Sequence, residues 1–318
     1  MTKTGLSPFP AGTVILSSRA PIGKVAIAGC DMYCNQGFKN LICSEVINNR
    51  YLYWFLKGNT EYLNSLGRGA TFKEISKQIV SDIEINVPLI KVQEEAVHIL
   101  EKISGVIQLR KQELQTLDGL IKARFVEMFG DPMVNPKKHA IKTYGELFEL
   151  NAGGTPSKTK PEYWENGTIS WIGSNLCQNK ILYENDGKYI SQEGYDHSSA
   201  RLFPIDTVLI ALVGATIGKT ALLKFDTSTN QNVLGVRNIT EAGYNPMFVF
   251  YYTQFLYQKF MNIGDGGFNM ASKGFVSELP MYDIDLLEQN EFATFAEQVD
   301  KSKSRKKLNH KTENRLAS

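Results

Sequence analysis

Apolar residues in the middle of the chain recur at the three- and four-residue steps of a helix. Between positions 91 and 128 they form a stripe of the coiled-coil kind, which Arg110 interrupts. A helix over this span would be about 57 Å long at the rise per residue of an α-helix. Gly130-Asp131-Pro132 is a stop signal directly after it. The pattern therefore predicts one long helix here.

A second stripe begins at Phe292 and fades after Val299 into residues rich in lysine and arginine. We expect this segment to start as a helix and to fray towards its end. Since each helix exposes one apolar stripe, the two are expected to pack together, antiparallel. The residues expected to make this packing, or to dock another subunit, are Ile99, Ile103, Val106, Leu114, Leu117, Ile121, Phe125, Phe292, Phe295 and Val299.

The two halves of the chain are copies of one pattern. Asn35-Gln36 recurs as Asn230-Gln231, and Ile22-Gly23-Lys24 recurs as Ile217-Gly218-Lys219. Further matches keep the same order at an offset between 194 and 197, which indicates a tandem repeat. Residues 142–195, 54 in all, have no counterpart in the first copy.

Short strands are expected in each copy, before its long helix. Apolar, β-branched runs bounded by turn residues occur at 13–16 and again at 207–213. The predicted fold class is therefore α/β, or more fully mixed α+β: two related globules, each followed by a long helix.

Composition then limits the class of protein. With 318 residues, 42% of them hydrophobic, and a formal net charge of +2, the chain suits roughly two ordinary globular domains. It has no apolar run long enough to span a membrane and no signal peptide at its N-terminus, so we expect a cytoplasmic protein without a membrane partner. Four cysteines are too few for a disulfide scaffold. Near-neutral charge does not announce a nucleic-acid binder, so that function must rest on local features.

Several segments approach catalytic or metal-binding patterns without meeting them. Val213–Thr220 has three residues between its glycines where a phosphate-binding P-loop needs four, which favours a strand–turn–strand with Lys219 at the turn. Asn245-Pro246-Met247-Phe248 lacks one proline of the loop found in amino-methyltransferases, and a plain helix start is preferred. The histidines and cysteines lack metal-ligand spacing. We predict neither catalysis nor a metal site.

Polar and basic residues on glycine-rich loops are better suited to binding DNA. Hydroxyls and lysines suit phosphate oxygens, and amide side chains can read adenine in the major groove. For each such residue a solvated turn is an equal alternative, and Trp171 could equally be core. The candidates in the second copy are Thr155, Ser157, Lys158, Lys160, Trp171, Ser174, Asn175, Lys219, Gln231, Asn269 and Lys273. Those in the first copy are Arg19, Lys24, Gln36, Arg68 and Lys73.

The order and duplication of these motifs resemble the specificity (S, HsdS) subunits of type I restriction–modification systems. The resemblance covers nearly the whole chain. The motifs that carry it are Gly153-Gly154-Thr155-Pro156-Ser157, Trp171-Ile172-Gly173-Ser174, Phe203-Pro204, Thr207-Val208-Leu209-Ile210, Ile217-Gly218-Lys219, Asn230-Gln231 and the run from Leu120 to Asp131.

This resemblance implies a division of labour. Each copy would hold a target recognition domain that reads one half of a bipartite DNA site. The long helices would set the distance between half-sites and dock methyltransferase (M) subunits. Those, with motor–nuclease (R) subunits, would supply methylation, ATP-driven translocation and cleavage. S-adenosylmethionine, ATP and Mg would then belong to the partners, and the S subunit itself would be non-catalytic and carry no cofactor.

The resemblance also suggests boundaries. We expect a partial first recognition domain at 1–87, a long central helix at 88–131, a complete second domain at 132–285, and a C-terminal helix with a basic tail at 286–318. The first domain is expected to be N-terminally truncated, and a second S chain is a candidate for completing it. Two alternatives stay open: a silent or recombining allele without DNA reading of its own, and a P-loop-like nucleotide-binding enzyme.

Overall fold

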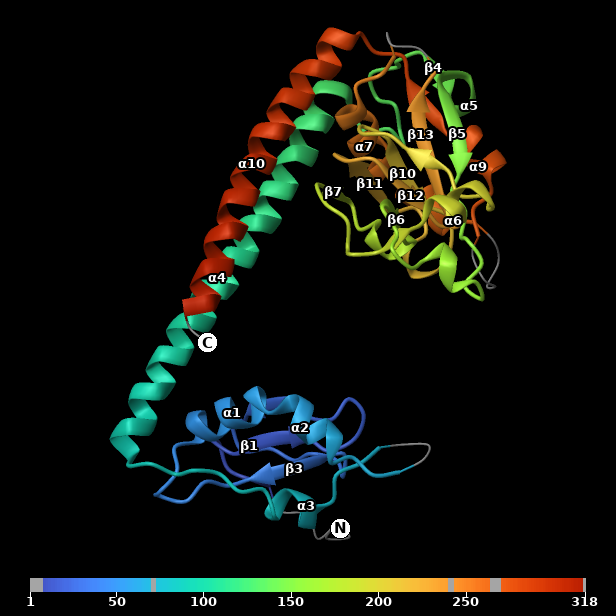
Figure 1. Ribbon diagram of the computed structural model, residues 1–318. Helices are drawn as coiled ribbons and strands as arrows, with labels where there is room; N and C mark the ends of the chain where they lie inside the picture. Colours follow the sequence, from blue (N-terminus) through green and yellow to red (C-terminus); the bar gives the residue numbers. More distant parts are fainter. Residues whose placement is uncertain (1–7, 70–72, 240–242, 264–269, 317–318) are drawn as a thin grey trace, which may run out of the picture. The chain divides into compact units, whose positions relative to one another are not determined.

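The computed structural model describes residues 8–69, 73–239, 243–263 and 270–316, with side chains described as far as Lys303 (Figure 1). The chain forms two compact units, residues 1–113 (unit 1) and 114–318 (unit 2). The division falls inside helix α4 (Ile90–Phe129), so that the first part of this helix belongs to unit 1 and the last part to unit 2. The predicted helix over 91–128 is thereby confirmed.

Unit 1 is a three-stranded antiparallel sheet in the order β2-β1-β3, covered by short helices. Val14 and Leu16 alternate along β1 and are buried against Leu52 and Leu56 of α1. The side chain of Asn48 caps α1 by accepting a hydrogen bond from the backbone N–H of Arg50 at 2.8 Å. The elements are β1 (Val14–Ser17), β2 (Val25–Ile27), β3 (Phe38–Leu41), α1 (Asn49–Gly58), α2 (Thr60–Ser65) and α3 (Lys77–Ser81).

Unit 2 is built on a five-stranded sheet in the order β5-β13-β10-β11-β7, and a four-stranded sheet, β8-β6-β12-β9, packs on one of its faces. A two-stranded sheet, β14-β4, completes the strands. The strands are β4 (Ile141–Thr143), β5 (Phe148–Ala152), β6 (Ile169–Ile172), β7 (Lys180–Leu182), β8 (Tyr189–Ile190), β9 (Leu202–Phe203), β10 (Val208–Ala211), β11 (Thr220–Leu223), β12 (Thr227–Thr229), β13 (Val233–Asn238) and β14 (Pro280–Tyr282).

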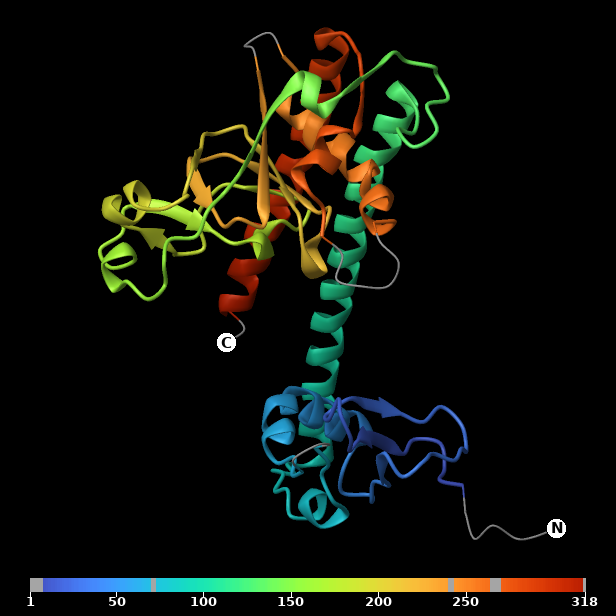
Figure 2. The same ribbon diagram turned by 90° about the vertical axis from the view of Figure 1, so that its right-hand side faces the viewer.

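The helices of unit 2 cover the other face of the five-stranded sheet and its ends, except α6, which packs against the short turn at 161–163. They are α5 (Tyr144–Leu147), α6 (Gln192–Asp196), α7 (Pro246–Phe255), α8 (Tyr257–Met261), α9 (Lys273–Ser277) and α10 (Leu286–Leu316), with 3₁₀ turns η1 (Pro161–Tyr163), η2 (Ser174–Leu176) and η3 (Gly214–Thr216). Figure 2 shows the yellow-green part of unit 2, which includes β6, β8 and α6, projecting away from the long helices.

Strand β10 explains why an uninterrupted apolar run marks the centre of unit 2. Its side chains alternate between two cores, with Val208 and Ile210 facing the helices and Leu209 and Ala211 facing the second sheet. A strand covered on both faces has no polar side, so it reads as a continuous hydrophobic segment.

The predicted repeat is confirmed by the topology. The central strands of unit 2 run β11-β10-β13, the same order as β2-β1-β3 in unit 1, and three short helices and a long helix follow in both. Even the isolated bridge between Phe9 and Met32 corresponds to the pairing of Phe203 with Thr227. In the described residues of unit 1, counterparts of β5 to β8 are not found.

A buried glutamine ties each long helix to its unit. Gln93 in α4 accepts a hydrogen bond from the backbone N–H of Asn48 at 2.8 Å and donates one to the carbonyl of Pro88 at 2.7 Å. Gln289 in α10 repeats this with the N–H of Asn245 at 2.9 Å and the carbonyl of Ile284 at 2.8 Å. Both side chains are almost fully buried, so the same clamp fixes where each helix starts.

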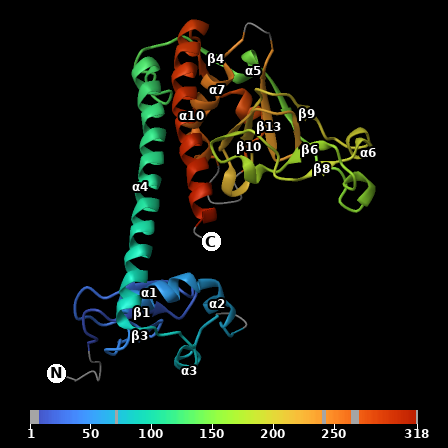
Figure 3. The same ribbon diagram turned by 60° about the vertical axis from the view of Figure 1, so that its left-hand side comes forward.

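Within unit 2, the end of α4 and the start of α10 pack side by side and antiparallel (Figure 3). Arg124 pairs with Glu291 at 2.8 Å, and Asp118, further back along α4, pairs with Lys303, further forward along α10, at 2.7 Å. The ring of Phe125 lies 5.1 Å from that of Phe292. The expected packing of the two stripes is therefore present in this unit.

The predicted packing residues divide between the two parts of α4. In unit 2, Ile121, Phe125, Phe292 and Val299 are buried, and Leu114, Leu117 and Phe295 are half-buried. In unit 1, Ile99, Ile103 and Val106 are exposed by 57%, 40% and 48%. In the part of the chain that the structure describes, no helix is long and apolar enough to cross a membrane.

Candidate functional site

The Gly-Gly-Thr-Pro loop after β5 is held tightly against the end of β12. The N–H of Gly154 donates to the carbonyl of Thr229 at 2.8 Å. A Cβ at Gly153 would lie 2.4 Å from the carbonyl oxygen of Thr229, and one at Gly154 would lie 2.3 Å from the backbone of Ser199. Only glycine fits this approach, so the paired glycines are a packing requirement that positions the following Thr155 and Ser157.

Two tryptophan side chains hold the same loop in place through their indole N–H groups. Trp171 on β6 is 7% exposed and donates its indole N–H to the carbonyl of Gly154 at 3.0 Å. Trp164 donates to the carbonyl of Ser157 at 3.1 Å and meets Trp171 edge to face, with ring centroids 5.2 Å apart. Trp171 is therefore a largely buried residue that shapes the loop, and it also lines the cleft described next.

A cleft of about 600 Å³ opens beside this loop. It brings together Lys158 and Asn175, two predicted candidates that are 17 positions apart in the sequence. The full lining is Lys158, Pro161, Trp164, Glu165, Trp171, Gly173, Asn175, Lys188 and Asn230. The cleft thus combines ammonium, amide and carboxylate groups with aromatic walls.

Lys188, Asn230 and Trp164 were not predicted as site residues. Lys188 enters the cleft because the side chain of Asn185 accepts hydrogen bonds from the N–H groups of Gly187 and Lys188, which shapes the turn between β7 and β8. The repeated Asn-Gln pair was a usable signal for Asn230, although only its neighbour Gln231 was selected.

The other candidates near the loop bond to neighbouring residues and do not line the cleft. Thr155 donates to the side-chain oxygen of Gln231 at 2.6 Å, which places these two predicted residues together. Ser157 bonds to Thr159 at 2.8 Å. Lys160 donates to the Tyr163 hydroxyl at 2.8 Å, and this bond raises the pKa of Lys160, so that it stays charged but lies outside the cleft lining.

The remaining candidates of unit 2 are spread over separate loops. Ser174 begins the turn η2, and Lys273 is exposed at the start of α9. Lys219 lies in the turn between η3 and β11, as expected for a strand–turn–strand. Its ammonium group donates to the side-chain oxygen of Gln178 at 3.2 Å. A P-loop would continue into a helix here, whereas Thr220 opens a strand. Asn269 lies outside the described residues.

In unit 1, three of the five candidates share one cleft of about 410 Å³: Arg19, Lys24 and Gln36. Their charge is partly balanced, because Arg19 forms an ion pair with Glu74 at 3.1 Å. Arg68 pairs with Glu74 only through the backbone, and Lys73 is exposed. Neither of these two lines the cleft.

The near-miss segment at 245–248 and the buried Cys177 have structural roles. Asn245 caps α7 and Pro246 is its first residue, as predicted for a plain helix start. Cys177 is buried, and burial raises its pKa to about 12, so its thiol is unreactive. Among the described residues, no group of three or more His, Cys, Asp or Glu side chains is arranged to hold a metal ion.

The amino-acid sequence matches one known protein family over most of its length. The sequence pattern described as Type I restriction modification DNA specificity domain matches residues 1–118 and 136–314. The chain belongs to this family. The matched residues include most of both units and of both long helices, α4 and α10.

Relatives within the specificity family are similar over part of their length. The chain is 33% identical over 184 residues to the type I restriction enzyme MjaIX specificity subunit of Methanocaldococcus jannaschii, a match that covers 56% of this chain and 40% of that protein. It is 31% identical over 150 residues to the EcoR124I/EcoR124II specificity subunit of Escherichia coli, covering 46% of this chain and 36% of that protein. The matches thus span well under half of these relatives.

Solved structures from type I restriction–modification systems share the fold. The S subunit from M. genitalium superposes with a TM-score of 0.55 at 16% identity, covering 96% of this chain and 81% of that one. A chain from a structure of the assembly and conformational transition of the type I system superposes with a TM-score of 0.58 at 17% identity, covering 98% and 80%. At this identity the likeness concerns the fold alone.

Proposed function

We propose that this chain is the DNA-recognition subunit of a type I restriction–modification assembly, and that unit 2 reads one half of its DNA site. The observation that carries the proposal is the cleft lined by Lys158, Asn175, Lys188 and Asn230, in a chain that belongs to the specificity family. Membership of the family supports the class of function, and the cleft supports the location.

The cleft offers both kinds of contact that sequence-specific DNA binding needs. The exposed ammonium groups of Lys158 and Lys188 suit phosphate oxygens, which position a protein on DNA without reading its sequence. The amides of Asn175 and Asn230 can donate to and accept from one adenine, and the carboxylate of Glu165 can accept from cytosine. Base selection is therefore assigned to these three polar side chains.

The proposal leaves chemistry to partner subunits. The exposed stripe of Ile99, Ile103 and Val106 on α4 suits docking of a methyltransferase (M) subunit. Methylation with S-adenosylmethionine, and translocation and cleavage with ATP and Mg, would belong to M and R subunits, with this chain binding double-stranded DNA in the cytoplasm. A second specificity chain is proposed to extend the unit 1 sheet, which in its described residues ends at β2 and β3 where unit 2 continues to β7 and β5.

Selection of bound duplexes from a randomised DNA library tests the proposal. We expect the wild-type chain to enrich one short motif containing adenine. Asn175→Ala or Asn230→Ala should relax the preference at individual positions, since one bidentate contact provides about 1–3 kcal/mol of discrimination. Lys158→Gln with Lys188→Gln should weaken binding to all duplexes equally.

A matched control is Asn290→Ala, selected under the same salt, because Asn290 is exposed on α10 and does not line the cleft. The wild-type motif should persist in this variant. Enrichment of no motif by the wild-type chain, or the same motif from both cleft asparagine variants, would contradict the proposal.

A further inference from the structure

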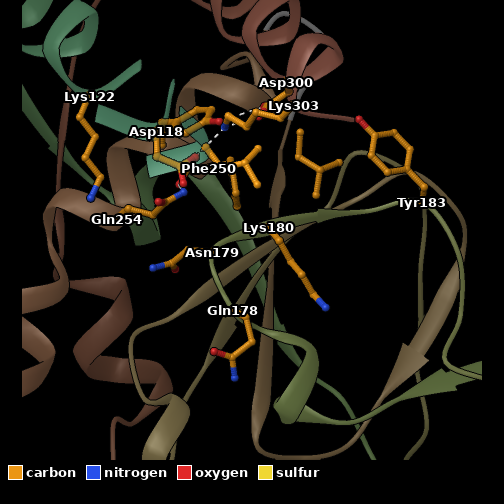
Figure 4. Close-up of a pocket in the computed structure, with 13 residues that line it drawn as sticks. Asp118, Lys122, Gln178, Asn179, Lys180, Tyr183, Phe250, Gln254, Asp300 and Lys303 are labelled. Atoms are coloured by element: carbon orange, nitrogen blue, oxygen red, sulfur yellow. Dashed lines mark hydrogen bonds and ion pairs between the residues drawn. The ribbon is translucent and has the colours of Figure 1, made fainter. Parts of the chain in front are cut away.

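A second cavity of unit 2, about 670 Å³ in volume, lies between α4, α7, α10 and β7 (Figure 4). We propose that its outer edge is a DNA-phosphate contact that continues the cleft of the proposed function, on which this inference rests. The edge consists of Lys122 on α4 and Lys180 on β7, which line the cavity, together with Lys219 before β11, which bonds to the lining residue Gln178; it is called here the lysine ledge. Gln178 and Asn179 lie on the loop that leads into β7.

The two carboxylates of the cavity, Asp118 and Asp300, share one internal cation, Lys303. Lys303 is bonded to Asp300 at 2.6 Å and to Asp118 at 2.7 Å, and the Tyr251 hydroxyl also donates to Asp300 at 2.9 Å. Burial would lower the pKa of Lys303, but its bonds to Asp118 and Asp300 outweigh this and raise it, so the ammonium stays charged. These acids therefore have a fixed cation of their own.

The lysines of the ledge are left to meet an external anion. Among the described residues, neither Lys122 nor Lys180 has an acidic partner, and both side chains are exposed. Figure 4 shows the ends of Lys180 and Gln178 directed away from Lys303, and the side chain of Lys122 at a separate place on α4. Two ammonium groups without a counter-charge suit the phosphates of a nucleic-acid backbone.

The backbone beneath the ledge is fixed in place. Asn179 adopts a left-handed conformation, with φ of 55°, and its side-chain oxygen accepts a hydrogen bond from the N–H of Thr220 at 2.9 Å. Its own N–H donates to the carbonyl of Thr220 at 2.8 Å. Cys177 anchors the same loop in the core. A pre-formed loop loses little conformational freedom on binding, as a phosphate site requires.

Gln178 joins the ledge to the proposed recognition cleft. Its side-chain oxygen accepts from Lys219 at 3.2 Å, and its side-chain nitrogen donates to the carbonyl of Asn175 at 3.2 Å. Asn175 lines the recognition cleft and Gln178 lines the cavity, so one loop belongs to both. This continuity favours DNA over an acidic protein partner, because one strand could pass from the cleft to the ledge.

The salt dependence of binding by the full chain tests the inference, with a mixed-sequence DNA duplex as the probe. The test variant is Lys122→Gln with Lys180→Gln. Its matched control is Lys138→Gln with Lys142→Gln, before and within β4, which lies at the other end of unit 2 from β6 in Figures 1 and 3. Both variants lose two positive charges.

Each phosphate contact adds about 0.9 to the slope of log K against log salt concentration, so loss of two contacts should reduce the slope by about 1.8. The control should keep the wild-type slope. If the wild-type chain binds the duplex and the test variant has the control's slope, the ledge inference alone is wrong. If the wild-type chain binds no DNA, the proposed function is wrong as well.

Chemical acetylation of lysines gives a second measurement that does not depend on folding of a variant. The duplex should protect Lys122 and Lys180 in the wild-type chain, whereas inorganic phosphate at the same ionic strength should not. Equal protection by both would indicate a site for free phosphate. Protection by a purified methyltransferase subunit and not by the duplex would indicate a protein contact. Either result would overturn the inference.

Discussion

Replacement of Gln289 by leucine should destabilise unit 2 specifically. The side chain is 2% exposed and satisfies the N–H of Asn245 at 2.9 Å and the carbonyl of Ile284 at 2.8 Å. Leucine has a similar size but can satisfy neither group. A buried polar group left without a partner costs about 1–3 kcal/mol, so two such groups should lower the free energy of unfolding by about 2–6 kcal/mol.

Urea unfolding followed by circular dichroism, combined with amide hydrogen exchange, measures this effect. Exchange should accelerate at the start of α7 and of α10 and stay unchanged in unit 1. Gln93→Leu should produce the mirror result in unit 1, because Gln93 makes the equivalent bonds to Asn48 and Pro88. Gln298→Leu, at an exposed position of α10, is the control and should change stability by no more than about 0.5 kcal/mol. A Gln289→Leu chain as stable as this control would refute the reasoning.

Three further outcomes follow from the packing. Phe125→Ala should lower the free energy of unfolding by about 3–5 kcal/mol, because this fully buried ring contacts Phe129, Phe248 and Phe292. Val126→Ala, on the exposed face of α4, should lower it by less than about 1 kcal/mol. Thermal unfolding distinguishes the two variants. Iodoacetamide at neutral pH should label exposed Cys30 and leave Cys177 unmodified until the chain unfolds, and mass spectrometry of the native protein would contradict this if Cys177 reacted first. Burial raises the pKa of Tyr282 to about 12, above the value of about 10 in the unfolded chain. The stability that this residue contributes is therefore complete below pH of about 10 and is lost as pH rises towards about 12. A urea midpoint that increases over this range would contradict the reasoning.

Periodicity and repetition predicted the framework because both leave direct traces in the sequence. The stripe from 91 to 128 marks α4 because residues three and four positions apart share one face of a helix. The repeated Asn-Gln and Ile-Gly-Lys segments lie in matching connections between strands of the two units, which is why their offset is nearly constant. The long helix and the repeated units could therefore be predicted from the sequence alone.

The site was harder to predict because strand pairing assembles it from distant segments. Parallel pairing of β6 with β12 brings Asn230 to the cleft that already contains Lys158, and no short-range pattern announces that pairing. Trp171 could not be assigned from sequence because tryptophan has an apolar body and a polar tip. In the structure its indole N–H donates a hydrogen bond to the carbonyl of Gly154 within unit 2.

The division of α4 between two units has a consequence for synthesis of the chain. Phe125 leaves the ribosome 167 residues before Phe292, the ring it meets on α10. At roughly 5–20 residues per second this delay is about 8–33 s, during which the aromatic end of α4 has no covering helix. Unit 1 contains its own start of α4 and can fold during that time. The nascent chain must therefore keep Ile121, Phe125 and Phe129 from aggregating until α10 arrives.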